Sequence, residues 1–309
     1  MERRDFLKTA VVSGLAPQGF TSAKSQAIPR RTYKGNDKLS IVGFGGIIVM
    51  GLEQKEASGI VAEAHDRGVN YFDVAPSYGN GEAEMKLGPA LEPYRKNAFL
   101  ACKTGKRDAA GAQLELYRSL NRLKTDHFDL YQMHGIAKME DVDQILAAGG
   151  AAETFVKAKK EGKVRYIGFS AHHVQAAIRL MDNLELDSVL FPVNYVNYAE
   201  GHFGPQILAE AKKRGMARLA LKALAQTTWK PGETKTYPNC WYRPIEDRET
   251  QEKALRFTLS EEVTAAIPPG YAKFLRAAID IASQFKPLVG PEREALLASA
   301  HNTEPIFKA

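Results

Sequence analysis

The stretch VRYIGFSAHHVQAAIRLMDNLELDSVLFPVNY, residues 164–195, joins two short apolar segments through a segment with helical spacing. The outer segments, 164–171 and 188–195, are rich in the β-branched and aromatic residues that favour strands. Between them, apolar residues recur every three or four positions over 174–184, as on one face of a helix. A strand, a helix and a strand in this order are typical of a unit with parallel strands. The stretch therefore predicts an α/β fold.

The same alternation continues along the chain in both directions. Eight strand candidates span 39–46, 70–75, 98–105, 127–134, 164–171, 188–195, 217–224 and 264–270, with helical segments between them. Eight such units predict one (β/α)8 TIM barrel over residues 28–309. The alternative is a doubly wound open sheet, which normally carries a complete glycine-rich dinucleotide fingerprint after its first strand. GFGGIIVMG at 43–51 does not complete that fingerprint, which favours the barrel.

The composition is that of a globular protein that can bury a large core. The 309 residues are 44% hydrophobic and 25% charged, and the net charge of +6 comes from Lys and Arg spread along the chain. Dispersed charges of this kind indicate solvated helix faces and not a nucleic-acid surface. Two cysteines are too few for a disulfide framework or a zinc site, and His172 and His173 are expected to be surface residues at a helix start. No metal site is expected.

The amino terminus has a different character. It carries Arg3-Arg4, then Phe6-Leu7-Lys8, a short apolar stretch, and SQA at 25–27 as a small-x-small cleavage pattern. These features indicate a twin-arginine export signal over residues 1–27. The apolar stretch is far shorter than the ~20 residues of a spanning helix, so stable membrane insertion is not expected. We expect a bacterial protein handled by the export machinery and located in the periplasm or outside the cell.

Polar residues occupy the ends of three consecutive strand candidates. In NYFDVAPSYGNGE, residues 70–82, Asp73 ends a strand and Tyr78 follows in the loop; Lys103 and His134 end the next two strands. The carboxyl ends of barrel strands are where active sites form. There Asp73 can supply the counter-charge to Lys103, and the ammonium is expected to lower the pKa of the Tyr78 phenol from about 10 toward neutrality. Tyr78 then becomes a candidate general acid, with His134 holding a substrate carbonyl oxygen.

Four stretches, GVNYFDVAPSYGNGEAEMKLGPAL, CKTG, HFDLYQMH and EGKVRYIGFSAHH, resemble the aldo-keto reductase superfamily. The resemblance covers roughly residues 37–285. It implies a (β/α)8 barrel, a catalytic tetrad formed by Asp73, Tyr78, Lys103 and His134, and NADP(H) or NAD(H) bound across the barrel mouth. It also implies an oxidoreductase that acts on a carbonyl/alcohol pair of a small molecule.

The resemblance extends to residues expected to bind the cofactor, with departures from the family pattern. Ser170 is kept, but Ala171 and Pro192 replace the family's Asn and Gln, which leaves Asn194 as a substitute for holding the nicotinamide carboxamide. Leu221 would cover the nicotinamide ring, and Lys222 would meet the pyrophosphate as a point charge. The remaining candidates flank the first and last strands: Gly45, Gly46, Gly270, Lys273 and Arg276. Lys273 and Arg276 would serve the adenosine 2′-phosphate, but their register departs from the family's, so NADP versus NAD stays open.

The long connection 226–248 carries several aromatic residues. Trp229, Tyr237, Trp241 and Tyr242 can form a stacking wall for a sugar-like or aromatic substrate. The alternative is that these side chains only pack the loop onto the barrel.

Three functions remain open. The first is the carbonyl/alcohol oxidoreductase, acting on a sugar-like substrate. The second is a redox-neutral lyase, hydrolase or isomerase that uses a tightly retained nicotinamide cofactor on a glycoside; export from the cytoplasm favours retention, because the periplasm offers no nicotinamide pool. The third is a catalytically silent, nucleotide-binding barrel, against which the complete tetrad argues.

Overall fold

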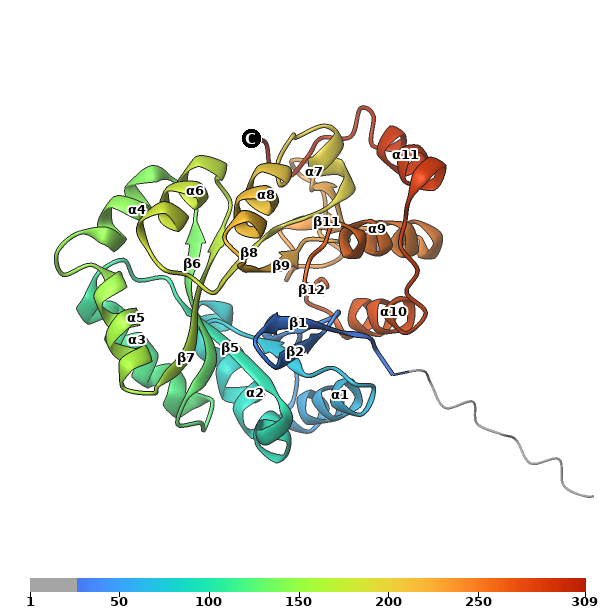
Figure 1. Ribbon diagram of the computed structural model, residues 1–309. Coiled ribbons are helices and arrows are strands. Elements are labelled where there is room, and N and C mark those ends of the chain that lie inside the picture. Colours follow the sequence, from blue (N-terminus) through green and yellow to red (C-terminus); the bar gives the residue numbers. More distant parts are fainter. Residues whose placement is uncertain (1–26) are drawn as a thin grey trace, which may run out of the picture.

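A closed barrel of eight parallel strands forms the centre of the computed structural model, which describes residues 27–309 (Figure 1). Around the barrel the strands are β3 (Phe44–Gly45), β4 (Tyr71–Asp73), β5 (Phe99–Thr104), β6 (Phe128–Ile136), β7 (Val164–Ala171), β8 (Ser188–Pro192), β9 (Ala217–Leu221) and β12 (Ala265–Ile267). The two ends of this sheet meet through a parallel bridge between Val42 and Ala266 and a Gly43 N–H donating to the Ala266 carbonyl at 3.0 Å. The predicted TIM barrel is confirmed. The predicted export signal lies, except for residue 27, outside the described residues.

Helices surround the barrel (Figure 1). The predicted helical segments form α1 (Gln54–Asp66), α2 (Glu82–Leu91), α3 (Ala109–Arg122), α5 (Ala151–Lys160), α6 (Val174–Asn183), α8 (Pro205–Lys213), α9 (Arg248–Ser260) and α10 (Ala272–Ser283). Side chains cap several of them; Asp108 accepts from the Gly111 N–H at 2.7 Å to begin α3, and Asp247 does the same for α9 with Thr250 at 2.8 Å. Short 3-10 turns add η1 (Gly46–Val49), η2 (Tyr78–Gly81) and η3 (Glu92–Asn97).

Several elements were not expected from the sequence. They are α4 (Met139–Leu146), α7 (Tyr195–Ala199), α11 (Gly290–Ser299) and the hairpin of β10 (Ala225–Thr228) and β11 (Tyr242–Pro244). The predicted strand 188–195 ends early at Pro192, because Asn194 caps α7 by accepting from the Asn197 N–H at 2.8 Å.

A second hairpin closes the amino end of the barrel. β1 (Arg30–Lys34) and β2 (Asp37–Ser40) pair antiparallel, so the predicted strand 39–46 is wrong as one element: it is divided between β2 and β3. Tyr33 of β1 is 5% exposed and packs on Phe99, while its hydroxyl donates to Ser188 Oγ at 2.9 Å. The hairpin is therefore the floor of the barrel.

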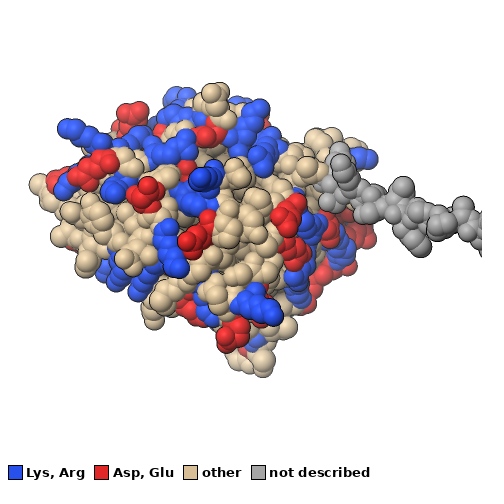
Figure 2. Space-filling model, turned by 90° about the horizontal axis from the view of Figure 1, so that it is seen from below, with Lys and Arg blue, Asp and Glu red and all other residues tan. Residues whose placement is uncertain are grey.

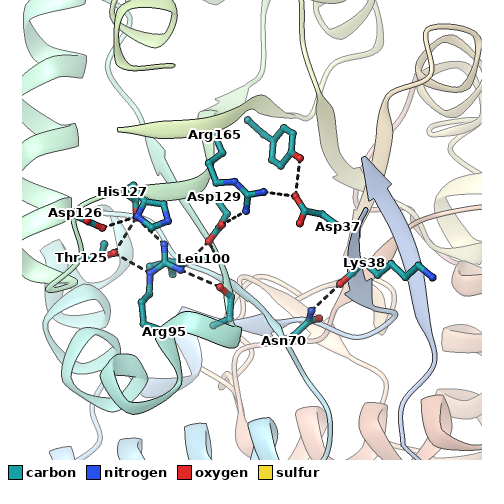
Figure 3. Close-up of polar contacts among 12 residues, drawn as sticks. Asp37, Lys38, Asn70, Arg95, Leu100, Thr125, Asp126, His127, Asp129 and Arg165 are labelled. Carbon is teal, nitrogen blue, oxygen red and sulfur yellow. Dashed lines mark hydrogen bonds and ion pairs between the residues drawn. The ribbon is translucent and has the colours of Figure 1, made fainter. Parts of the chain in front are cut away.

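An ion network fastens this floor to the strands (Figure 3). Asp129 of β6 accepts from Arg95 at 3.0 Å, from Arg165 at 2.7 Å and from the Leu100 N–H at 2.9 Å. Arg165 also donates to Asp37 in the hairpin at 2.7 Å. Because every charge in this network has a partner of opposite sign, we infer that the network has a structural role.

The surface mixes charges of both signs. On the face drawn in Figure 2, Lys and Arg side chains alternate with Asp and Glu side chains. None of the helices between residues 27 and 309 is both long enough and apolar enough to cross a membrane.

Candidate active site

A cavity of about 220 Å³ opens at the carboxyl end of the barrel strands. Strand ends, the loops after them and the segment 239–242 supply its walls: Gly45, Ile47, Asp73, Tyr78, Lys103, His134, Ser170, His172, Leu190, Leu221, Lys222, Asn239, Cys240, Trp241, Tyr242, Ile267, Pro268 and Gly270. The four predicted catalytic residues lie together in it, because three successive parallel strands and the loop after β4 end at the same edge of the sheet.

Asp73 and Lys103 form a buried ion pair at the base of the cavity. Asp73 is 2% exposed and Lys103 is fully buried, and the Lys103 ammonium donates to Asp73 Oδ1 and, at 3.3 Å, to the Val74 carbonyl. Burial alone would lower the pKa of Lys103, but Asp73 and Tyr78 outweigh it, so the pKa is raised and the ammonium stays charged.

Two further side chains fix Asp73, and the sequence analysis missed both. Gln132 Nε2 donates to Asp73 Oδ2 at 2.9 Å, and the Tyr71 hydroxyl donates to the same oxygen at 3.2 Å. Each precedes a tetrad residue by two positions on a strand, and alternate residues of a strand share a face. The polar side chains two positions before His134 and Asp73 could therefore have been predicted to face the same site.

Tyr78 is placed by an unusual turn. The next three residues, Gly79, Asn80 and Gly81, all have positive φ, at 60°, 53° and 95°. The φ of 95° at Gly81 favours glycine, and a Cβ there would lie 2.0 Å from Arg122 Nη1, so the Arg122 side chain would have to move. The turn brings the Tyr78 ring centroid to 5.4 Å from the Lys103 ammonium.

The phenol of Tyr78 is neutral, contrary to the sequence-based expectation. Burial raises its pKa by more than Lys103 lowers it, and the charge of Asp73 adds to the rise, so the predicted lowering is wrong. His134 meets the Tyr78 ring edge-on, with centroids 5.9 Å apart. Burial, followed by the charge of Lys103, lowers the pKa of His134 to about 3. Both side chains therefore enter the chemistry uncharged.

Some of the predicted cofactor residues line the cavity and others do not. Gly45, Ser170, Leu221, Lys222 and Gly270 line the cavity, whereas Gly46 does not. A Cβ at Gly46 would lie 2.7 Å from the Val74 side chain, which gives this glycine a packing role. Ser170 Oγ accepts the Gly135 N–H at 2.7 Å, which leaves the hydroxyl hydrogen available to a ligand.

The geometry does not favour Asn194 as the substitute for the family's Gln, an assignment that stays a prediction. Its Oδ1 caps α7 and its Nδ2 donates to the Lys222 carbonyl at 3.3 Å, and its side chain is not among those lining the cavity. The reason is that β8 ends at Pro192 and α7 begins at Tyr195, so the Asn194 side chain is used as the helix cap.

Lys273 and Arg276 do not line the cavity either. Lys273 contacts the Tyr237 hydroxyl and lies 3.3 Å from Glu246, and Arg276 makes a bidentate pair with Glu63 at 2.7–3.0 Å. Both cations already have carboxylate partners, so a 2′-phosphate would have to displace them. Their assignment to that phosphate remains a prediction that the geometry does not favour.

Two of the four predicted aromatic wall residues face the cavity. Trp241 and Tyr242 line it, and Trp241 is 46% exposed. Trp229 instead donates its indole N–H to the Cys240 carbonyl at 2.8 Å, and Tyr237 is buried with its hydroxyl on Glu246. For these two residues the packing alternative is correct.

His172 is a wall residue, not the surface residue expected from the sequence. It lines the cavity and stacks on Phe307 with ring centroids 4.8 Å apart. Burial, with a contribution from Lys222, lowers its pKa to about 4. His173 does begin a helix as expected, since its Nδ1 accepts from the Ala176 N–H at 3.2 Å. Phe307 lies near the carboxyl terminus, far from His172 in the sequence, so no local sequence pattern could predict this contact.

The cavity suits one end of a nicotinamide cofactor. Leu221 and Ile267 offer apolar faces to a flat ring, and Ser170 offers a hydroxyl to a carboxamide. Its volume lies below the ~300–1,000 Å³ usual for ligand pockets, so only part of a dinucleotide would lie inside it. Within residues 27–309, no three His, Cys, Asp or Glu side chains are grouped to hold a metal ion.

Comparisons with known proteins agree with this geometry. A sequence model of the aldo/keto reductase family matches residues 42–277. The chain is 26% identical over 310 residues to the uncharacterized oxidoreductase YqkF of Bacillus subtilis, covering 91% of this chain and 99% of that protein.

Two further relatives match less completely or at lower identity. L-galactose dehydrogenase of Arabidopsis thaliana is 29% identical over 174 residues, which span 52% of this chain and 54% of that protein. Among solved structures, the holo form of the aldo-keto reductase AKR11C1 of Bacillus halodurans superposes with a TM-score of 0.71. It is 22% identical and the match covers 90% of this chain and 98% of that one. This likeness concerns the fold.

Proposed function

The chain belongs to the aldo/keto reductase family, and on that basis we propose that it interconverts a carbonyl and an alcohol on a small molecule. One observation carries the proposal: Asp73, Tyr78, Lys103 and His134 converge in a single cavity at the carboxyl end of the barrel. The catalytically silent barrel is disfavoured by this complete set, in which Asp73 and Lys103 form an ion pair.

In the proposed reaction Tyr78 moves the proton. Its raised pKa keeps the phenol protonated at neutral pH, so it can donate to a carbonyl oxygen as negative charge develops there. The nearby Lys103 ammonium then stabilises the phenolate that remains. His134, held neutral, donates a hydrogen bond to the same oxygen and orients the carbonyl.

We assign the nicotinamide end of NADP(H) or NAD(H) to Leu221, Ile267 and Ser170. When bound, the reduced cofactor supplies the hydride for the carbonyl carbon. Leu221 and Ile267 would exclude water from that carbon, and the Ser170 hydroxyl would orient the ring. Gly45 and Gly270 sit where neighbouring loops approach closely; a Cβ at Gly270 would lie 2.4 Å from Ile47.

We propose a sugar-like substrate. Trp241 and Tyr242 give the cavity an aromatic wall on which a sugar ring can stack. The relationship to a protein described as L-galactose dehydrogenase is consistent with such a substrate.

The proton-transfer role is tested by replacing Tyr78 with Phe. Purified protein is assayed with NADPH and NADH on a panel of aldoses, keto-sugars and simple aldehydes, following cofactor absorbance. The variant should lose on the order of 10²-fold or more in kcat, the usual scale of general acid catalysis, with an unchanged Tm. Tyr117→Phe, at an exposed tyrosine on α3, is the matched control and should keep full activity. Near-normal turnover by Tyr78→Phe would contradict the mechanism.

We also propose that the cofactor is retained through catalysis, as the predicted export requires. The segment 239–242 lies against the same cavity and can cover a bound ring. The mature protein should keep its nucleotide through dialysis into cofactor-free buffer. Given both an alcohol that donates a hydride and a carbonyl compound that accepts it, it should turn over without added cofactor, because the second half-reaction regenerates the bound nucleotide. Ready loss of nucleotide, with activity restored only by adding NADPH, would assign the protein to reductases that exchange their cofactor.

A further inference from the structure

Lys222 is the one cation of the cavity wall without an acidic partner among the described residues. Its ammonium lies 4.6 Å from the Tyr242 ring centroid and 5.5 Å from that of Trp241. The charged or ionisable neighbours that act on it are Cys240 and Lys103, and neither is a carboxylate. Two aromatic faces compensate only partly for the water that this ammonium has lost.

An uncommon backbone conformation holds Lys222 in this position. Its φ is +68°, a left-handed conformation that is uncommon for a residue with a side chain and costs free energy. The Lys222 carbonyl accepts two hydrogen bonds, from Asn194 Nδ2 at 3.3 Å and from the Ala225 N–H at 2.9 Å. Asn194 is itself fixed as the cap of α7. The strain and its supports direct one unpaired ammonium into the cavity.

The charges of the cavity therefore do not balance. Among residues 27–309, Asp73 is the only carboxylate on the cavity wall, and its oxygens already accept from Lys103, Gln132 and Tyr71. The imidazoles of His134 and His172 are neutral. A protonated Lys222 leaves one uncompensated positive charge in a partly desolvated space, which a bound anion would neutralise.

We propose that the substrate is a small carbonyl compound that bears a carboxylate, an oxo acid or sugar acid, and that Lys222 binds the carboxylate. This inference rests on the proposed function and defines its substrate class. The cavity of about 220 Å³ also has to hold the nicotinamide ring assigned above to Leu221, Ile267 and Ser170, so the substrate that fits beside that ring is small. Such a molecule would place its carbonyl at Tyr78 and its carboxylate at Lys222, which line the same cavity.

The test uses matched pairs of ligands that differ in the acid group. D-galacturonate is compared with D-galactose, D-glucuronate with D-glucose, and pyruvate with hydroxyacetone, in titrations of the full-length protein followed by ligand-observed NMR. For at least one pair, the acid should bind at least about tenfold more tightly than its neutral partner, the size of one charge-assisted contact. Lys222→Met should abolish that preference with an unchanged Tm, and Lys222→Arg should restore part of it. Lys230→Met removes an exposed lysine from the same connection and should change nothing.

ADP titrations distinguish a second source of the anion. If Lys222→Met weakens ADP tenfold and leaves the acids unaffected, Lys222 serves the pyrophosphate of the cofactor and the inference is overturned. It is also overturned if no acid binds at its solubility limit, or if acids and neutral partners bind equally. These results differ from failure of the proposed function, which would appear as absent turnover on every carbonyl compound, neutral or acidic.

Discussion

Two lysines in one cavity show how neighbours decide the chemistry of a residue. Lys103 has Asp73 against it, and its pKa is raised despite complete burial. Lys222 has aromatic rings and no carboxylate, and desolvation lowers its pKa to about 8. Both are strand-end lysines in the sequence. The carboxylate partner of Lys103, and with it the opposite sign of the pKa shift, separates the paired cation from the one that can receive a ligand.

Replacing Lys103 with Met should destabilise the protein. Asp73 would remain as a buried carboxylate without its counter-charge, which typically costs about 3–5 kcal/mol. We expect about 3 kcal/mol in the free energy of unfolding, because Gln132 and Tyr71 still donate to Asp73. Urea unfolding measures the loss. The double variant Asp73→Asn/Lys103→Met should recover most of it, and a single variant as stable as the parent would show that the pair contributes nothing.

The two cavity histidines should make stability depend on pH. Their pKa values are lowered to about 3 for His134 and about 4 for His172, against ~6.5 in the unfolded chain. As pH falls below ~6.5 the unfolded chain takes up these protons first, so their contribution is complete above pH ~6.5 and is lost toward pH 3–4. The Tm of His134→Gln/His172→Gln should therefore fall less steeply than that of the parent between about pH 7 and 4.5. Parallel curves would rule out this contribution.

At the scale of elements, the two ends of the barrel have different roles. The carboxyl end is built from turns in uncommon conformations, after β4 and after β9, each of which aims one side chain into the cavity. The amino end is built from the β1–β2 hairpin and a network in which Asp129 joins two arginines. Two turns with positive φ thus lie where ligands would bind, and the Asp129 network lies where the hairpin is fastened to the barrel.

Asp129→Ala should separate these two roles. It removes the shared partner of Arg95 and Arg165 and leaves the Leu100 N–H without its acceptor (Figure 3), so we expect a loss of about 3 kcal/mol. The kcat of the folded fraction should be unchanged, because the network lies at the end opposite to the cavity. Asp126→Ala, at an exposed carboxylate on the loop just before β6, is the control and should stay within ~0.5 kcal/mol of the parent. An equal effect of the two changes would contradict the assignment.

At the scale of the whole molecule, the β1–β2 hairpin closes the amino end of the barrel, and in the sequence it precedes the first barrel strand. Tyr33 fills the floor from inside, and Lys34 pairs with Asp187 at the start of β8. A chain beginning at Ile28 keeps these contacts, whereas one beginning at Asn36 loses them.

Truncation should therefore have a sharp limit. Removal of residues 1–27 should leave the Tm unchanged, in agreement with a separate signal. Removal of residues 1–35 should cost at least about 3 kcal/mol, the usual cost of losing one buried aromatic side chain, because Tyr33 leaves the floor. Circular dichroism melting of the two proteins measures the difference. A large loss on removing 1–27 alone would place part of the predicted signal in the folded domain.

The sequence determined the barrel and the tetrad because both depend on short-range information. Alternating strand and helix periods specify parallel units, and a residue at the end of one of these strands must face the same edge as its neighbours. The exceptions were also local in their cause: Pro192 and Asn194 turned a predicted strand end into α7, and β2 took the first residues of the strand predicted at 39–46.

Only the tertiary structure decided the electrostatics and the remaining walls of the site. Arg276 is neutralised by Glu63, 213 positions away, and His172 is buried by Phe307 near the other end of the chain. The pKa of Tyr78 rises because burial outweighs Lys103, a balance that depends on how much water the folded loops exclude. Pairing and desolvation are properties of distances in space, and contacts between residues this far apart in the chain leave no periodic pattern in it.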